Sequence, residues 1–465
     1  MFSSSPLDWG LVGLYFAFLA IVWWRGRGRI STTVDYLVAG RRVTLPAFVA
    51  TLVATWYGGI LGVGEYSWSY GISNWLVFGV PYYIGALLFA LLFAKRARAV
   101  ALYTIPDLLE QRYGRGPALF GALVVFITSA PAAYVLVLGT LFAAMTGLPL
   151  APCILAAAVL SMFYIDKGGL RTVVFTDQVQ FVLMYAGFIV LLAFLVARHG
   201  LLPFEPGALP STHLMWHGGN PPAAIFVWYF IALSALVDPG FWQRAFAARD
   251  PKVARTGVLW SIAFWILFDF MTTMCGLYAR ALLPTLSDPV LAFPDLARFV
   301  LPPVALGFFY LGMIATVMST IDSYGFIAAT TIGRDFVWRL RRDASEARIP
   351  FYTRIGLAIA TLFAAGIALT SRSVIDLWHD IGSVTTPALL IPVGAALLGV
   401  GTLSSAWALA TMAIPFAITL VWVSIKAFGN AHAYPFALEP IYAGLASSLV
   451  VYTAGRLAHR RGVTP

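Results

Sequence analysis

The segment MSTIDSYG places polar residues inside a long apolar stretch of the chain. Ser319, Thr320 and Ser323 share one face of a predicted helix, and Thr316 lies one turn earlier on that face. Hydroxyl, carboxylate and carbonyl oxygens are hard donors that suit a small hard cation. Serines in membrane helices also bond back to their own helix. A cluster that includes Asp322 is less easily explained in that way and favours an ion-binding site.

Other acidic residues fall inside apolar segments, where a carboxylate at the bilayer centre costs roughly 2.5–3.5 kcal/mol. Asp177 lies in VVFTDQVQF, where an interfacial position is the alternative to a functional one. Asp238 precedes a Pro-Gly pair that breaks a helix, where it either contacts a ligand or caps the second half. Asp269 and Glu65 leave a functional and a structural role equally open.

The stretch Thr51–Glu65 carries Gly58, Gly59, Gly62 and Gly64 between apolar residues. Each glycine lowers helix stability by about 1 kcal/mol relative to alanine, so this run favours local unwinding. Unwound backbone at membrane depth lines a cavity or binds a cation, and a broken helix near the midplane marks a transporter's binding site. A close helix crossing through small residues is the alternative.

Composition indicates a membrane protein. Of 465 residues 60% are hydrophobic and 11% are charged, and the mean hydropathy is +0.84; soluble domains have about 25% charged residues. Thirteen apolar runs are long enough to cross a bilayer. The predicted spans are 8–26, 46–72, 75–95, 117–146, 149–166, 172–198, 221–243, 254–283, 302–333, 351–371, 374–399, 404–427 and 437–456.

The spans suggest a repeat. Residues 46–200 and 201–400 each hold five spans and each begin with an interrupted helix. Because five is an odd number, the second block must be inverted relative to the first, as in many secondary transporters. Residues 1–45 then form an extra N-terminal helix with its loop, and residues 401–465 form two C-terminal helices with a short tail.

The basic residues are distributed unequally between the two sides of the predicted membrane spans. Twenty-five of the 30, Arg244 among them, fall in the segments on one side of the thirteen spans, including the joints RGRGR at 25–29 and RLRRDASEAR at 339–348. This bias predicts an external N-terminus and a cytoplasmic C-terminus. It also makes the basic residues topological anchors, so nucleic acid is not an expected partner.

The sequence contains no recognisable set of catalytic residues that would indicate an enzyme. The chain shows no nucleophile–base–acid order, and its glycines lack the G-K-[ST] of a P-loop. Cys153 and Cys275 both fall inside predicted spans without metal-type spacing, so we expect neither a disulfide nor a metal site from them.

Between Asp35 and about residue 400 the chain resembles the sodium:solute symporters, which include sodium-coupled glucose, proline, sialic acid and choline transporters. Five motifs match in order: ATWYGG at 54–59, GGLRTVVFTDQVQ at 168–180, DPGFWQR at 238–244, VMSTIDS at 317–323 and GRDF at 333–336. The resemblance implies an all-α integral membrane protein with the LeuT-type fold, a five-plus-five inverted repeat preceded by one extra helix.

The resemblance also implies a principal sodium site. It would take carbonyl oxygens from Ala54, Tyr57 and Thr316 and hydroxyl oxygens from Ser319 and Thr320, and every one of these positions holds an oxygen donor here.

A second sodium site, present in some members, would map onto Asp177, Ser319, Asp322 and Ser323. Asp322 is a departure, because other members place serine there. Its carboxylate should strengthen a cation site or bind a proton.

For the substrate, the resemblance implies contacts at the two broken helices. ATWYGG is closest to the choline transporters, in which a tryptophan at the Trp56 position faces substrate. Gly58 and Gly59 lie at the same break, and Asp238 and Trp242 at the other. The Pro-Gly pair after Asp238 departs from the family's usual residues, which weakens any inference about substrate by analogy. A carboxylate opposite an aromatic face suits a solute with a cationic group.

The leading hypothesis is therefore sodium-coupled symport of a small polar organic solute into the cell by alternating access, in a bacterial-type inner membrane. One alternative is a proton-driven transporter of the same fold, with Asp322 or Asp177 carrying the proton. Another is a symporter-like sensor module. Only Arg456–Pro465 follow the last span, so a sensor would need a separate signalling partner.

Overall fold

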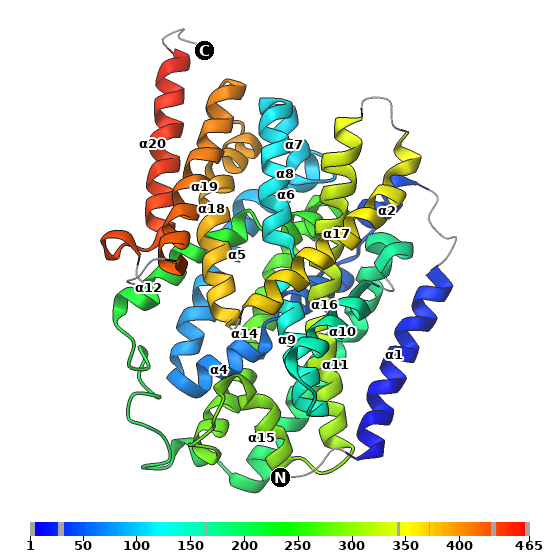
Figure 1. Ribbon diagram of the computed structural model, residues 1–465, viewed down its shortest axis with the longest axis vertical. Coiled ribbons are helices and arrows are strands. Elements are labelled where there is room, and N and C mark those ends of the chain that lie inside the picture. The colour runs from blue at the N-terminus through cyan, green and yellow to red at the C-terminus, as the bar shows by residue number, and fades with distance from the viewer. Residues whose placement is uncertain are drawn as a thin grey trace.

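The computed structural model describes residues 5–26, 32–162, 165–341, 345–371, 373–428 and 434–460, with the backbone alone at 23, 26, 162 and 165–167. Apart from one isolated β-bridge between Val43 and Ala248, every regular element in these residues is helical (Figure 1). The prediction of an all-α protein is confirmed.

Long helices and short 3₁₀ or π segments, labelled η, alternate along the chain. The first half contains α1 (Pro6–Gly26), α2 (Thr33–Val38), η1 (Ala39–Arg41), α3 (Leu45–Trp56), α4 (Ile60–Tyr70), η2 (Trp75–Gly79), α5 (Val80–Leu88), η3 (Phe89–Phe93), α6 (Ala94–Ala99), α7 (Ile105–Tyr113), α8 (Arg115–Ser129), α9 (Ala132–Thr146), α10 (Leu150–Met162) and α11 (Ile165–His199).

The second half contains η4 (Leu202–Phe204), α12 (Pro222–Ile231), η5 (Ala232–Leu236), α13 (Pro239–Ala247), α14 (Pro251–Leu282), η6 (Pro289–Leu291), α15 (Ala292–Val300), α16 (Ala305–Thr330), η7 (Thr331–Trp338), η8 (Glu346–Arg348), α17 (Ile349–Thr370), α18 (Val374–Leu398), α19 (Ser405–Phe428), η9 (Pro435–Ala437) and α20 (Pro440–Arg460).

Each of the thirteen predicted spans falls on a helix. Within the described residues, nine helices are long and apolar enough to cross a membrane, and the bent pair α3–α4 makes a tenth span. Two more runs form the shorter apolar helices Pro6–Val22 and Leu150–Ser161, and the last run forms α20. The joints at 25–29 and 339–348 continue into residues outside the described part of the chain.

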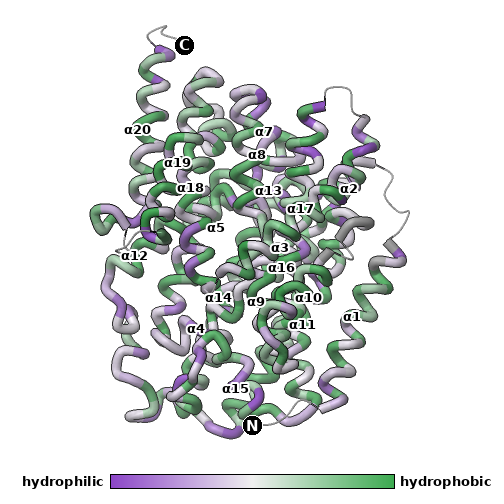
Figure 2. The backbone as a smooth tube through the Cα atoms, viewed as in Figure 1, coloured by the Kyte–Doolittle hydropathy of each residue, from purple (hydrophilic) through white to green (hydrophobic). Residues whose placement is uncertain are grey.

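The bundle is apolar outside and carries charge inside, the reverse of a soluble protein. Leu14, Leu362 and Val450 are 69%, 74% and 65% exposed, whereas Asp177 and Asp322 are fully buried. Hydrophobic residues cover the middle of the molecule, and hydrophilic ones gather toward its two ends (Figure 2). The exposed apolar surface is that of a multi-pass membrane protein.

Two helices break at the centre, as the glycine run and the Pro-Gly pair predicted. α3 and α4 meet at Tyr57–Gly59 with a bend of 61°. α12 tightens into η5, and the chain restarts as α13 after Asp238. α11 and α16 pack along each other, α3 packs against both, and α13 contacts α3 and α16. The long helices thus hold both breaks in the core.

Candidate functional site

The break of α3 lies against the hydroxyl face of α16. A Cβ built on Gly58 would meet the Thr320 side chain at 2.5 Å, so only glycine allows this approach. Thr320 Oγ1 donates to the Thr55 carbonyl at 2.8 Å. The last turn of an α-helix has carbonyls without amide partners, and α3 ends here, beside two buried hydroxyls, Ser319 and Thr320.

These oxygens fit a small hard cation. The helix-end carbonyls include those of Ala54 and Tyr57, and the α16 donors are Thr316, Ser319 and Thr320, all buried. No group of three or more His, Cys, Asp or Glu in the described residues could hold a metal ion. The donors of the predicted sodium site are carbonyls and hydroxyls instead.

Asp177 of α11 gathers polar side chains from three other helices, α3, α13 and α16. Its Oδ1 accepts from Ser319 Oγ at 2.8 Å, and its Oδ2 accepts from the Thr51 hydroxyl. Ser323 Oγ lies 3.5 Å from Oδ2. Sequence reasoning placed Asp177 and Ser323 in one site, and the structure brings them together.

Arg244 is the residue that sequence reasoning placed wrongly. It was expected to be a topological anchor, but its side chain is only 1% exposed and pairs with Asp177 at 3.4 Å. Its Nη2 also donates to Thr55 Oγ1 at 3.0 Å and to Ser323 Oγ. A charge inside an apolar span is costly enough to demand a partner, and that cost was the signal available in DPGFWQR.

Asp322 lies on α16 with Ser319 and Ser323, two of the other predicted ligands of the second sodium, and is fully buried. On the neighbouring helices, Tyr15 of α1 accepts a hydrogen bond from Gln180 of α11, at 2.8 Å.

A cavity of about 140 Å³ lies between the two breaks. Its aromatic lining includes Trp56, Phe78, Tyr82, Tyr134, Tyr324 and Trp378. Two carboxylates, Asp238 and Asp269, line the same cavity, and none of its described lining residues is Lys, Arg or His. Gly59 also lines it, and a Cβ there would lie 1.5 Å from Trp378, so this glycine lets the indole close over the break.

Gly58 and Trp242, the other two predicted substrate contacts, are not among the residues that line the cavity. Gly58 faces Thr320. The Trp242 indole donates to the Leu236 carbonyl at 2.9 Å, and its ring packs against Phe89, which leaves it 1% exposed. The structure gives Trp242 a packing position.

Of the two roles that the sequence left open for Asp238, capping is confirmed, and contact with a ligand stays a prediction. Its Oδ1 caps α13 by accepting from the Phe241 amide at 3.0 Å. Its Oδ2 accepts from the Tyr324 hydroxyl at 2.6 Å, and the residue lines the cavity.

Asp269 of α14 also lines the cavity, and it accepts a hydrogen bond from the Tyr83 hydroxyl. Tyr82, Tyr134 and Tyr324 also line it and were missed. The sequence pattern around a tyrosine in an apolar run is the same whether its side chain lines a cavity or packs in the core.

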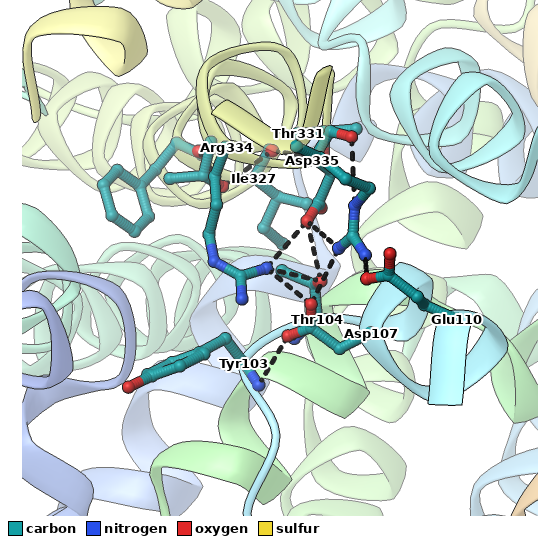
Figure 3. Close-up of polar contacts among 11 residues, drawn as sticks. Tyr103, Thr104, Asp107, Glu110, Ile327, Thr331, Arg334 and Asp335 are labelled. Atoms are coloured by element: carbon teal, nitrogen blue, oxygen red, sulfur yellow. Dashed lines mark hydrogen bonds and ion pairs between the residues drawn. The ribbon is translucent and has the colours of Figure 1, made fainter. Parts of the chain in front are cut away.

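The GRDF motif belongs to a separate ionic cluster that joins η7 to α7 (Figure 3). Arg334 and Arg339 reach Asp107 at 2.8 and 2.7 Å, and both also pair with Asp335. Burial alone would raise the pKa of Asp107, but the two guanidinium groups outweigh it and hold that pKa below its ordinary value. Glu110 of α7 pairs with Arg339 as well.

Comparison with known proteins gives one consistent result. Residues 36–400 match the family model described as the sodium:solute symporter family. The osmoregulated proline transporter of Bacillus subtilis is 25% identical, over 97% of this chain and 96% of its own. The human high affinity choline transporter 1 is 24% identical, over 80% of this chain and 69% of its own.

Among solved structures, a substrate-bound, outward-open Na⁺-coupled sialic acid symporter superposes with a TM-score of 0.76 at 15% identity, covering 98% of both chains. Mhp1, a nucleobase-cation-symport-1 family transporter in a closed conformation, superposes with a TM-score of 0.57 at 13% identity, covering 93% of this chain and 96% of its own. At these identities the likeness concerns the fold, and it confirms the predicted LeuT-type architecture.

Proposed function

We propose that this chain, which belongs to the sodium:solute symporter family, is a secondary active transporter. It couples the uptake of a small polar organic solute to sodium by alternating access. The observation that carries this proposal is the meeting of the α3 break with the hydroxyl face of α16, where Thr320 donates to the Thr55 carbonyl. An ion held by both elements ties the broken helix to α16.

Sodium would be held by the carbonyls of Ala54, Tyr57 and Thr316 and the hydroxyls of Ser319 and Thr320. Sodium is the coupling ion, and its electrochemical gradient across the membrane would drive transport. The residues contribute an oxygen cage in a buried place, which excludes water from the ion.

The second sodium site stays a prediction on Asp177, Ser319, Asp322 and Ser323. The Arg244 guanidinium already contacts Asp177 and Ser323. A second ion would bind among these oxygens only if Arg244 moved, since two positive charges that close repel.

We propose that the solute carries a cationic group. The cavity presents two carboxylates and several aromatic faces, and its described lining includes no basic side chain. Carboxylates offset a positive charge, and an aromatic face adds roughly 0.5–2 kcal/mol of attraction. The choline transporters among the relatives act on such a solute, which supports this choice over a neutral one.

Asp238→Asn and Asp269→Asn test the charge. Asparagine caps a helix nearly as well as aspartate, so a purely structural role for Asp238 predicts near-normal transport in its variant. Charge balance predicts a large loss for a cationic solute in both variants and little loss for a neutral one. Normal transport of a cation by both variants would contradict the proposal.

The orientation that we propose has the N-terminus outside and the C-terminus in the cytoplasm of a bacterial-type inner membrane. α1 begins at one end of the bundle and α20 ends at the other (Figure 1), which suits an odd number of spans. Proteolysis of right-side-out and inside-out vesicles would report which loops face outward.

The deciding experiment is uptake by proteoliposomes of solutes first selected in a thermal-shift screen, in sodium and in potassium. Uptake should require inward sodium at fixed pH and should vanish in potassium. Uptake that follows a pH gradient and ignores sodium would replace sodium by a proton and overturn the coupling that we propose. A chain that binds a solute without moving it would be the sensor module.

A further inference from the structure

We infer that Arg244 is a positioning residue, which carries the effect of sodium at Ser319 to Asp238 in the solute cavity through helix α13. This inference rests on the proposed sodium coupling and goes beyond it by assigning the residues that connect the ion to the solute. The connection starts at a hydroxyl of the sodium site and ends at a carboxylate of the cavity.

The first contact sets the direction of a sodium ligand. Ser319 Oγ donates to Asp177 Oδ1 at 2.8 Å. A hydroxyl has one hydrogen and two lone pairs. Because its hydrogen is directed at Asp177, the lone pairs of Ser319 are left for a cation on the other side. Asp177 therefore orients Ser319 even if it binds no ion itself.

The second contact joins Asp177 to α13. Arg244 Nη2 lies 3.4 Å from Asp177 Oδ2, and the two side chains are 1% and 0% exposed. The same nitrogen donates to Thr51 Oγ1 at 3.2 Å and to Thr55 Oγ1 at 3.0 Å, both on α3. Separating a buried ion pair leaves a charge without compensation and is strongly unfavourable. Arg244 and Asp177 are thus held in register with each other and with the broken helix.

The third link is the helix itself. α13 runs from Pro239 to Ala247 as one nine-residue helix, and Asp238 caps its first turn. Arg244 lies on this helix and Asp238 lines the cavity at its start. A helix this short moves as a unit, so a constraint on Arg244 is also a constraint on the position of Asp238.

The sign of the coupling follows from ordering. A cation on the lone pairs of Ser319 makes its O–H a stronger donor to Asp177 Oδ1, which fixes the position of that carboxylate. Sodium then holds Asp177 more firmly, Asp177 holds Arg244, and α13 becomes ordered with Asp238 toward the cavity. The solute meets a preorganised carboxylate and binds more tightly. By linkage, the solute raises sodium affinity by the same factor.

The test measures hydrogen–deuterium exchange of the Phe241–Ala247 amides in the purified full-length protein, with sodium as the probe and potassium at equal ionic strength as its control. Sodium should slow exchange of α13 in the wild type by about tenfold, within the roughly 5- to 150-fold range of coupled sites. Arg244→Lys keeps the positive charge but replaces the planar guanidinium, with its five N–H donors, by a single ammonium group. It should still be stabilised against heat by sodium, while the protection of α13 falls to within twofold of the potassium value.

Two further variants close the test. The double variant Arg244→Gln with Asp177→Asn removes both charges together, so neither is left unpaired, and it should lose the protection of α13 as Arg244→Lys does. Arg249→Gln, at an arginine whose side chain is 65% exposed, should retain it. Protection of α13 that persists in Arg244→Lys or in the double variant overturns the inference. A wild type with no sodium-specific stabilisation or protection would instead show that the proposed sodium coupling fails.

Discussion

A methyl group at Gly58 should damage sodium binding more than it damages the fold. An alanine Cβ would lie 2.5 Å from Thr320 Cβ, 2.6 Å from its Oγ1 and 2.7 Å from its Cγ2. Carbon atoms in contact prefer about 3.5–4.0 Å, so the break and α16 must separate by about 1 Å. That separation moves the Thr320 hydroxyl relative to the carbonyls of the break, which are its partners in the sodium site.

The magnitude follows from the cost of overpacking. An extra methyl group in a packed core costs about 1–3 kcal/mol. If the whole cost falls on the sodium-bound arrangement, sodium affinity drops by roughly 5- to 150-fold. The half-saturating sodium concentration for thermal stabilisation of the purified protein measures this directly, and uptake into proteoliposomes gives an independent value.

Gly62→Ala is the matched control. It lies in α4 of the same broken helix, and its new Cβ would meet no atom closer than 3.4 Å, at Ile375 Cγ1. This variant should keep the wild-type sodium requirement. If Gly58→Ala also kept it within twofold while folding normally, Thr320 would not be a sodium ligand and the assignment of this site would be wrong.

Three other outcomes are expected. Ser319→Ala should fold normally, since alanine suits a packed helix, and should weaken sodium affinity by about tenfold, or 1.4 kcal/mol; an unchanged sodium dependence of uptake would exclude Ser319 as a ligand. Arg339→Ala leaves the buried carboxyl groups of Asp107 and Asp335 with one arginine fewer, so a loss of about 3 kcal/mol is expected; an unchanged melting temperature in detergent would argue against a stabilising cluster. His213 bonds to the Trp68 carbonyl at 3.0 Å, and burial lowers its pKa, so the stability it contributes above its ordinary pKa of about 6.5 is lost as pH falls below that value. The protection factors of the amides in the 200–220 segment, which are corrected for the intrinsic exchange rate at each pH, should accordingly fall between pH 7 and 5 in the wild type, and less in His213→Gln; equal pH dependence in both would refute this role.

Much of the fold could be predicted because its signals are local. Apolar length places a segment across the membrane without reference to any neighbour, and each of the thirteen predicted runs falls on a helix. The breaks were readable for the same reason: glycine at 58 and 59 and proline at 239 act on their own backbone. Helical periodicity was enough to put Ser319 and Thr320 on one face.

What only the tertiary structure decided are the contacts between residues distant in the chain. The pairing of Arg244 with Asp177 joins positions 67 residues apart. The apolar residues around Arg244 indicate at most that a buried charge there needs a partner, and they do not say which residue supplies it. Likewise Trp378 lines the cavity, whereas Trp242 does not line it and packs against Phe89. Both are tryptophans in apolar helices. Local chemistry sets where a helix forms and where it breaks. The role of a side chain on that helix depends on which residues of the neighbouring helices pack against it, and only the tertiary structure provides those residues.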